Sequence, residues 1–116
     1  MLSGEKGAQA EEKAADYLRS LGCSILERNY RSRLGEIDII AQDGEGVVFV
    51  EVRSRARSSF GLARETVGFW KQRRIVKTAM MYALMKRLDC PMRFDVIAFE
   101  GDRLEHLPDA FDAAGF

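Results

Sequence analysis

Residues that often reveal a function are scarce in this sequence. Its one histidine, His106, excludes a metal site built from several histidines, and we expect it to be an ordinary surface or edge residue. The two cysteines, Cys23 and Cys90, are isolated, so neither a zinc site nor a disulfide framework is expected. Buried free thiols of this kind are typical of a reducing compartment.

Long hydrophobic runs are also absent. No apolar stretch approaches the roughly 20 residues that cross a bilayer, and the stretch MLSGEKGAQAEEK at the start lacks the apolar segment of a secretory signal. We therefore expect a cytoplasmic protein that does not insert into a membrane. The 116 residues are 47% hydrophobic and 31% charged, which predicts one folded domain over residues 1–116.

The net charge is zero, but the charges are segregated along the chain. Residues 53–77 hold eight basic residues and one acid, whereas the rest of the chain holds ten basic and seventeen acidic residues. Such a basic segment favours binding to a polyanion, because phosphate contacts dominate nucleic-acid affinity. An ordinary solvated helix face is the alternative. The basic residues of the segment are Arg53, Arg55, Arg57, Arg64, Lys71, Arg73, Arg74 and Lys77.

The segment 33–55 predicts a β-hairpin. Residues 34–41 and 47–52 are rich in the β-branched and aromatic residues that favour strands. The sequence Asp-Gly-Glu-Gly at 43–46 lies between them and is typical of a turn. Both predicted strands also contain acidic residues, which are unusual in an apolar hairpin.

Alternation of side chains places these acids on shared faces. Glu36, Asp38 and Ile40 are expected on one face of the first strand, and Glu51 and Arg53 on one face of the second. Arg53 would direct a positive charge toward a bound phosphate. The two faces coincide when the strands pair.

The position of the turn decides which acids are opposed. With a loop at 44–45, Asp38 lies opposite Glu51; with a loop at 43–44, Glu36 lies opposite Glu51. Opposed like charges are destabilising, and a divalent cation such as Mg²⁺, which takes oxygen ligands, would explain them. The alternative is a salt-bridged, solvated hairpin with Glu51–Arg53 and Glu36–Arg33 pairs. The spacing leaves both explanations open.

The segment 5–21 predicts an amphipathic helix with Glu11 on its apolar stripe. A carboxylate on a packing face is costly unless it is paired or binds a metal. Glu11 is therefore either a third acid that reaches the hairpin or a residue at the edge of the stripe that meets an arginine.

The remaining elements complete an α-β-β-β-α-β-β order. Strands are expected at 23–30, 93–100 and 103–107, and a long helix at 69–88. Lys71 borders the core-facing side of that helix, from where it could point at the hairpin acids. The order predicts an α/β fold with a mixed sheet and helices on both sides.

Several motifs resemble the YraN family of small bacterial proteins, also called UPF0102. This family is related to archaeal Holliday-junction resolvases and to the PD-(D/E)xK nuclease superfamily. The matching stretches are GxxAExxAxxYL at 7–18, RNYR at 28–31, GEIDII at 35–40, VFVEVR at 48–53, FG at 60–61, KQ at 71–72, RFDV at 93–96 and AF at 110–111. The resemblance covers nearly the whole chain.

The resemblance implies a restriction-endonuclease-like fold, with a mixed central sheet flanked by helices. It also implies that Glu11, Asp38 and Glu51 bind a metal, Mg²⁺ or Mn²⁺, with the backbone carbonyl of Val52 as a further ligand. Position 53 corresponds to the lysine of the superfamily. Arg53 suits phosphate binding, but it is a poor general base because a guanidinium is effectively never deprotonated.

Three functions are compatible with this reading. The first is a Mg²⁺- or Mn²⁺-dependent endonuclease for DNA, including branched or repair-intermediate DNA. Cutting both strands of a junction needs two active sites and hence a homodimer, for which the Met-rich face of the helix at 69–88 is a candidate contact. The second is a nucleic-acid-binding module that has lost catalysis, and the third is a structural or adaptor protein.

Each function assigns roles to particular residues. In the endonuclease, the catalytic residues would be Glu11, Asp38, Glu51, Arg53 and Lys71, where Lys71 partly replaces the missing lysine amine. The residues expected to contact the DNA backbone are Arg55, Arg57, Arg64, Arg73, Arg74 and Lys77.

Overall fold

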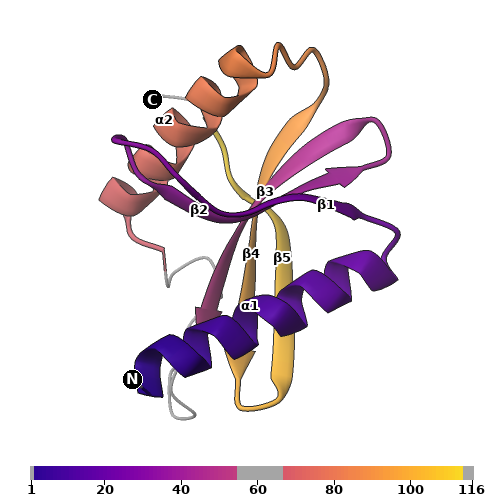
Figure 1. The fold of residues 1–116 in the computed structure, drawn as a ribbon, viewed down its shortest axis with the longest axis vertical. Helices are drawn as coiled ribbons and strands as arrows, with labels where there is room; N and C mark the ends of the chain where they lie inside the picture. Colours follow the sequence, from indigo (N-terminus) through magenta and orange to yellow (C-terminus); the bar gives the residue numbers. More distant parts are fainter. Residues whose placement is uncertain (1, 55–66, 114–116) are drawn as a thin grey trace.

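The computed structural model describes residues 2–54 and 67–113, with side chains from residue 7 onward. A five-stranded sheet in the order β1-β2-β3-β4-β5 lies between two helices (Figure 1). The helices are α1 (Leu2–Ser20) and α2 (Phe69–Met85). The strands are β1 (Ser24–Arg31), β2 (Glu36–Asp43), β3 (Gly46–Ser54), β4 (Met92–Glu100) and β5 (Arg103–Phe111).

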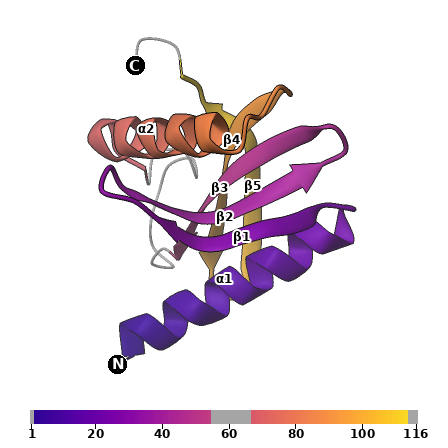
Figure 2. The same cartoon turned by 45° about the horizontal axis from the view of Figure 1, so that its top comes forward.

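The predicted fold class is confirmed. The elements follow the order α-β-β-β-α-β-β, and the sheet is mixed because β3 and β4 are parallel while the other neighbouring strands are antiparallel. Figure 2 shows α1 on one face of the sheet and α2 on the other. This mixed, helix-flanked sheet is consistent with a restriction-endonuclease-like arrangement. Within the described residues, no helix is long and apolar enough to span a membrane.

Each face of the sheet has its own apolar core. The core under α2 includes Phe49, Ile75 and Tyr82, and the core under α1 includes Leu18 and Val50. The strands between them are buried on both faces, as expected for the parallel part of a sheet. Because both faces of the sheet are packed against a helix, the ends of β2 and β3 are fixed in position and can carry a site.

The hairpin has one of its two predicted registers. Gln42 pairs with Val47 and Asp43 with Gly46, so the two-residue loop is Gly44-Glu45. Gly44 has φ +61°, a conformation that glycine adopts without the strain of a Cβ. The alternative loop at 43–44 is wrong.

Strand β5 and helix α2 end at residues other than those expected. Strand β5 continues to Phe111, beyond the predicted end at Leu107, and the ring of Phe111 stacks on Phe94 with centroids 5.2 Å apart. Helix α2 ends at Met85 because Arg87 adopts φ +53° and the Leu88 N–H turns back to the Ala83 carbonyl. Neither difference moves the predicted site residues.

The expected alternation of side chains fails at Asp38. Ile37 and Ile40 both lie in the α2-side core, whereas Ile39 lies in the α1-side core. Asn29, which lies across the ladder from Asp38, has φ +52°. The prediction that Glu36, Asp38 and Ile40 share one face is therefore wrong, and Asp38 lies at the point where the strand turns over.

Close approach of the β1–β2 connection to α2 generates a prediction about Gly35. A Cβ at this position would lie 3.0 Å from Thr78 Oγ1 and 3.3 Å from the Arg74 carbonyl oxygen. We expect Gly35→Ala to lower the free energy of unfolding by about 1–3 kcal/mol through overpacking, as measured by urea denaturation. Gly7→Ala is the control, because a Cβ there meets nothing within 4 Å and alanine favours a helix. An unchanged stability of the Gly35 variant would contradict the prediction.

Candidate functional site

A hollow opens where β2 and β3 separate. The last pair in their ladder is Ile39–Val50, and beyond it the Val52 N–H donates to Asp38 Oδ2 at 2.8 Å instead of to a strand carbonyl. The carboxylate of Asp38 thus replaces a backbone acceptor and holds β2 against β3. The separated strand ends leave space on either side of this hydrogen bond.

Two adjoining cavities occupy that space. The larger, about 500 Å³, is bounded by the β1–β2 connection, both strands and α2, and the smaller, about 330 Å³, by α1, both strands and α2. Asp38 and Lys71 line both cavities. Together the cavities contain every residue predicted to bind metal or act in catalysis. These are Glu11, Asp38, Glu51, Val52, Arg53 and Lys71.

Glu51 is the most deeply buried of these groups. Its side chain is 3% exposed, and Oε1 lies 3.1 Å from Lys71 Nζ. Its other oxygen, Oε2, is buried and has no hydrogen-bond partner among the described residues. A buried carboxylate oxygen without a donor is rare and costly, because the protein does not replace the water that it has lost.

Burial and the Asp38 charge raise the pKa of Glu51 to about 7, although Lys71 and Arg53 act in the opposite direction. Burial also raises the pKa of Asp38, against the Val52 N–H and Lys71. The pair therefore changes its charge near neutral pH.

Glu11 lies at the edge of this arrangement. It is half-buried on α1, and burial and the Asp38 charge raise its pKa while Asn29 and Arg28 lower it. Both predicted alternatives thus describe part of its surroundings, because it faces Asp38 and also lies near an arginine. The arginine itself forms its ion pair with Glu12, at 2.6 Å.

The salt-bridged alternative for the hairpin has different partners from those expected. Glu51 pairs with Lys71, and Glu36 lies 3.8 Å from Arg31. Arg53 borders the smaller cavity, and its Nε is buried without a hydrogen-bond partner among the described residues. A guanidinium group that borders a cavity and has an unused donor is suited to an anionic ligand.

The donor set fits a divalent cation held mainly by two carboxylates. Among the described residues, no three Asp, Glu, His or Cys side chains are grouped closely enough to form a metal site by themselves. Mg²⁺ typically binds one or two carboxylates and fills its other positions with water and substrate phosphates. Asp38 and Glu51, with the free Oε2, match this pattern, and Glu11 lines the smaller cavity together with Asp38.

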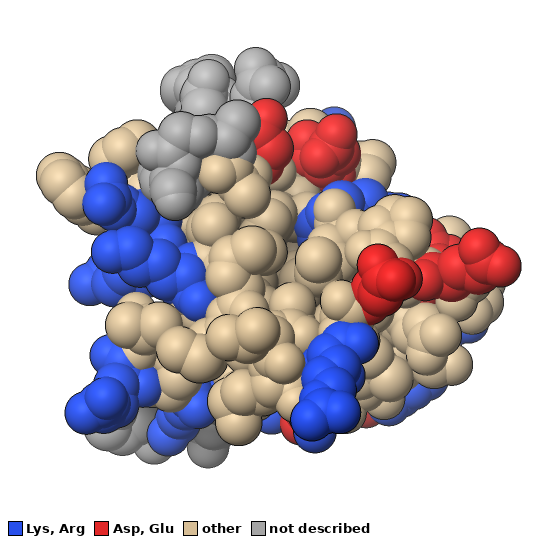
Figure 3. All heavy atoms as spheres, turned by 90° about the horizontal axis from the view of Figure 1, so that it is seen from above, with Lys and Arg blue, Asp and Glu red and all other residues tan. Residues whose placement is uncertain are grey.

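Basic side chains extend from the cavities along α2. Arg74 lines the larger cavity and is exposed, Lys77 is exposed one turn later, and Arg73 is half-buried. In the view of Figure 3, basic side chains gather mainly on the left and acidic ones on the right. Three further predicted DNA contacts, Arg55, Arg57 and Arg64, lie outside the described residues.

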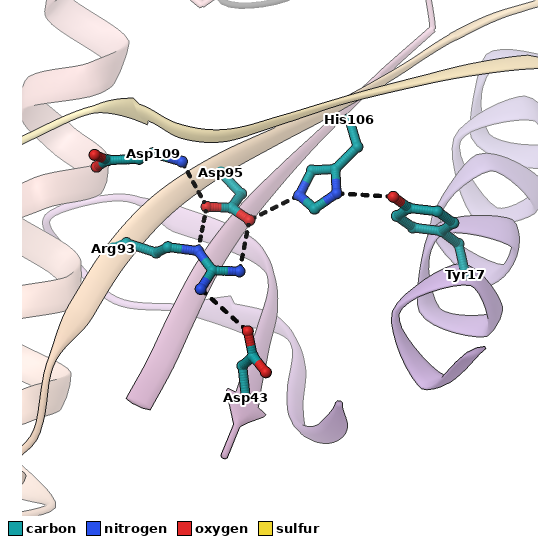
Figure 4. A network of polar contacts seen from close by, with 6 residues as sticks. All are labelled: Tyr17, Asp43, Arg93, Asp95, His106 and Asp109. Carbon is teal, nitrogen blue, oxygen red and sulfur yellow. Dashed lines mark hydrogen bonds and ion pairs between the residues drawn. The ribbon is translucent and has the colours of Figure 1, made fainter. Parts of the chain in front are cut away.

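A second polar cluster, on the α1 side of the sheet, was not predicted. Asp95 is fully buried on β4 and accepts hydrogen bonds from the Arg93 side chain and from the Asp109 N–H (Figure 4). Its Oδ2 lies 2.8 Å from His106 Nε2, and His106 Nδ1 lies 2.9 Å from the Tyr17 hydroxyl on α1.

This network ties α1 to the edge strand β5. His106 is on an edge strand, as expected, but it is no ordinary surface residue, because its side chain is only 11% exposed and both ring nitrogens are bonded. Burial raises the pKa of Asp95, but the His106, Arg93 and Asp109 hydrogen bonds outweigh burial and hold it below its usual value. The network satisfies a buried charge and is separate from the Glu51–Lys71 site.

Comparison with known proteins places the chain in a family. A family model described as "Uncharacterised protein family UPF0102" matches residues 10–99. The chain belongs to the UPF0102 family. The UPF0102 protein of Persephonella marina is 45% identical over 113 residues, covering 97% of both chains. Those of Syntrophus aciditrophicus and Dechloromonas aromatica are 50% and 48% identical, each over 93% of this chain and 89% of their own.

The UPF0102 family model matches residues 10–99, and this range contains all of the residues that line the two cavities except Gly7. The matched range therefore covers the Asp38–Glu51 pair on β2 and β3, and Lys71 and Arg74 on α2. Relatives of similar length share nearly the whole chain, so the candidate site belongs to the matched part of the UPF0102 fold.

The raised pKa of Glu51 generates a stability prediction. Between pH 4.5 and about 7 the folded state binds more protons at this site than the unfolded state, so folding stability falls as the pH rises. We expect Glu51→Gln to be more stable than the wild type at pH 8 in EDTA, by on the order of 3 kcal/mol. The difference should disappear near pH 4.5, as measured by urea denaturation across this range.

Glu45→Gln, in the exposed turn of the same hairpin, is the matched control for Glu51→Gln. It should change stability little at any pH, because its carboxylate is already in water. A constant difference between Glu51→Gln and wild type across the range would show that Glu51 does not titrate near neutral pH.

Proposed function

We propose that this UPF0102 protein is a divalent-cation-dependent endonuclease that hydrolyses DNA phosphodiesters. The main support is the buried, unpartnered Oε2 of Glu51 beside Asp38, in a cavity that also contains Lys71 and Arg74. Oxygen ligands next to basic side chains suit a cation and a phosphate at the same place. Bound Mg²⁺ or Mn²⁺ would supply an activated water and neutralise charge on the phosphate.

The residues of the chain have separate roles in this proposal. Asp38 and Glu51 hold the cation, with the Val52 carbonyl as a further ligand and Glu11 acting through water. Lys71 neutralises Glu51 in the absence of a cation and can turn to the phosphate when one is bound, because its side chain is 37% exposed. Arg53 and Arg74 hold the phosphate electrostatically, and neither accepts the proton of the attacking water.

The nucleic-acid surface continues from the site. Arg73, Arg74 and Lys77 on α2 track the DNA backbone without reading bases, and Arg55, Arg57 and Arg64 extend the basic segment in sequence. Branched or repair-intermediate DNA is the proposed substrate class. Cleavage of both strands at a branch requires two sites, and a homodimer would supply them.

A second candidate function is a nucleic-acid-binding module without catalysis. Arg53 favours it, because a guanidinium cannot take the place of a lysine amine in proton transfer. Among the described residues, no three carboxylates lie close enough together to hold a metal by themselves, which also favours it. This candidate predicts DNA binding that depends on salt but not on divalent cations.

Cation binding can be tested without any assay of activity. We expect an excess of Mn²⁺ or Mg²⁺ at pH 8 to raise the melting temperature of the wild type, because a ligand that binds only the folded state stabilises it, by about 2.7 kcal/mol at 100 times Kd. Glu51→Gln should lose this response, and Glu45→Gln should keep it. An equal response in both variants would remove Glu51 from the proposed cation site.

Cleavage tests the function itself. Linear, flapped and four-way DNA would be incubated with the wild type, Asp38→Ala/Glu51→Ala and Glu45→Gln, each with Mg²⁺, Mn²⁺ or EDTA. We expect cation-dependent products from the wild type and Glu45→Gln only. The double variant should lose more than about 100-fold in rate, since loss of an outer-shell partner alone costs about 10- to 100-fold. Salt-sensitive binding without cleavage by any protein would favour the binding module.

A further inference from the structure

An exposed tryptophan marks the beginning of α2. Trp70 is the only tryptophan in the chain, and it is 70% exposed in the first turn of the helix. Phe69 beside it is 55% exposed, with the two rings edge to face at 5.3 Å. Tryptophan is mostly buried in folded proteins, so a large exposed indole indicates a surface that contacts a partner.

The surroundings of Trp70 are basic. Trp70, Arg73, Arg74 and Lys77 line a shallow hollow of about 340 Å³ on one side of α2, as the spacing of three, four and seven residues requires. No acidic residue occurs between 67 and 85, and the first turn of the helix has none to offset the positive end of its dipole. A second copy of this same patch would be repelled, whereas a planar, anionic partner would be attracted.

A nucleotide is such a partner. Its base offers a flat face for stacking on an indole, and its phosphate offers the charge that arginine and lysine bind. Arg74 lines both this hollow and the larger cavity that contains Asp38 and Glu51. A strand whose base lies on Trp70 would therefore have neighbouring phosphates close to the proposed cation site.

We propose that Trp70 stacks on an unpaired base of the DNA strand that Arg73, Arg74 and Lys77 hold by its phosphates. The inference rests on the proposed function and specifies its substrate class. Bases within a continuous duplex are already stacked on their neighbours and expose no face to an indole, whereas unpaired bases do. The preferred substrate is then DNA with unpaired nucleotides beside the cleavage position, such as a flap, a gap or a single strand.

The single tryptophan makes the contact directly observable. In EDTA, which prevents cation-dependent cutting, the intrinsic fluorescence of the wild type would be titrated with a single strand, a gapped duplex and a blunt duplex of the same sequence. We expect quenching by the single strand and the gapped duplex, and little by the blunt duplex. Equal quenching by all three, or no quenching while DNA binds, would overturn the inference.

Variants give an independent measurement with labelled DNA and fluorescence anisotropy. Trp70→Ala should weaken binding of the single strand and the gapped duplex by at least about fivefold, in line with the loss of one stacking contact. It should leave blunt-duplex affinity unchanged, and Trp70→Phe should retain most of the wild-type affinity. Leu84→Ala, 75% exposed near the other end of α2, is the matched control and should bind as the wild type does.

The outcomes separate this inference from the proposed function. If the wild type cuts DNA and Trp70→Ala binds every substrate normally, only the stacking inference fails. If unpaired DNA quenches Trp70 but no protein cuts, the stacking contact stands and the endonuclease fails. A Trp70 fluorescence that changes with protein concentration alone, without DNA, would show that a second copy covers the residue, and would overturn the inference.

Discussion

The hydrogen bond from the Val52 N–H to Asp38 determines how the site is built. It forms where the β2–β3 ladder has ended, so a side chain takes the place of a backbone carbonyl. This substitution satisfies a donor that would otherwise be unpaired, and it fixes a carboxylate at the strand end. Glu51, one residue earlier on β3, is then buried next to a second acid, and burial, followed by the charge of Asp38, raises its pKa.

Lys71 makes this unfavourable arrangement tolerable. Two neighbouring carboxylates, one of them buried, cannot both be ionised without compensation. Protonation of Glu51, whose pKa is about 7, or the ammonium group 3.1 Å from its Oε1 compensates part of this charge. One oxygen of Glu51 still has no partner among the described residues. The described part of the chain offers this carboxylate oxygen no hydrogen-bond donor, and this is the physical reason to propose that an external cation binds here.

The sequence predicted those features that depend on local rules. The loop at Gly44-Glu45 was one of the two registers that turn chemistry allowed, and the approach of Lys71 to a hairpin acid follows from helical spacing. The burial of Glu51 was not predicted, because strand alternation left a solvated face open. The orientation of Asp38 was not predicted either, because the alternation of side chains breaks between Ile37 and Ile39, where the sequence has no turn residue to mark the break. The Asp95–His106 network was also missed, because its partners are distant in sequence and only the fold brings them together.

Helix α2 shows what counting charges can and cannot find in a sequence. The basic residues of 53–77 suggested a phosphate-binding face, and Arg74 does line the cavity with Asp38 and Glu51. Counting charges gives no weight to Trp70. From the sequence it could be a core residue, and only the structure shows that it is 70% exposed beside Arg73, Arg74 and Lys77. Charge attracts any nucleic acid, whereas an indole discriminates by whether a base is free to stack. In the proposed function, the combination would link general affinity for nucleic acid to a preference for unpaired DNA.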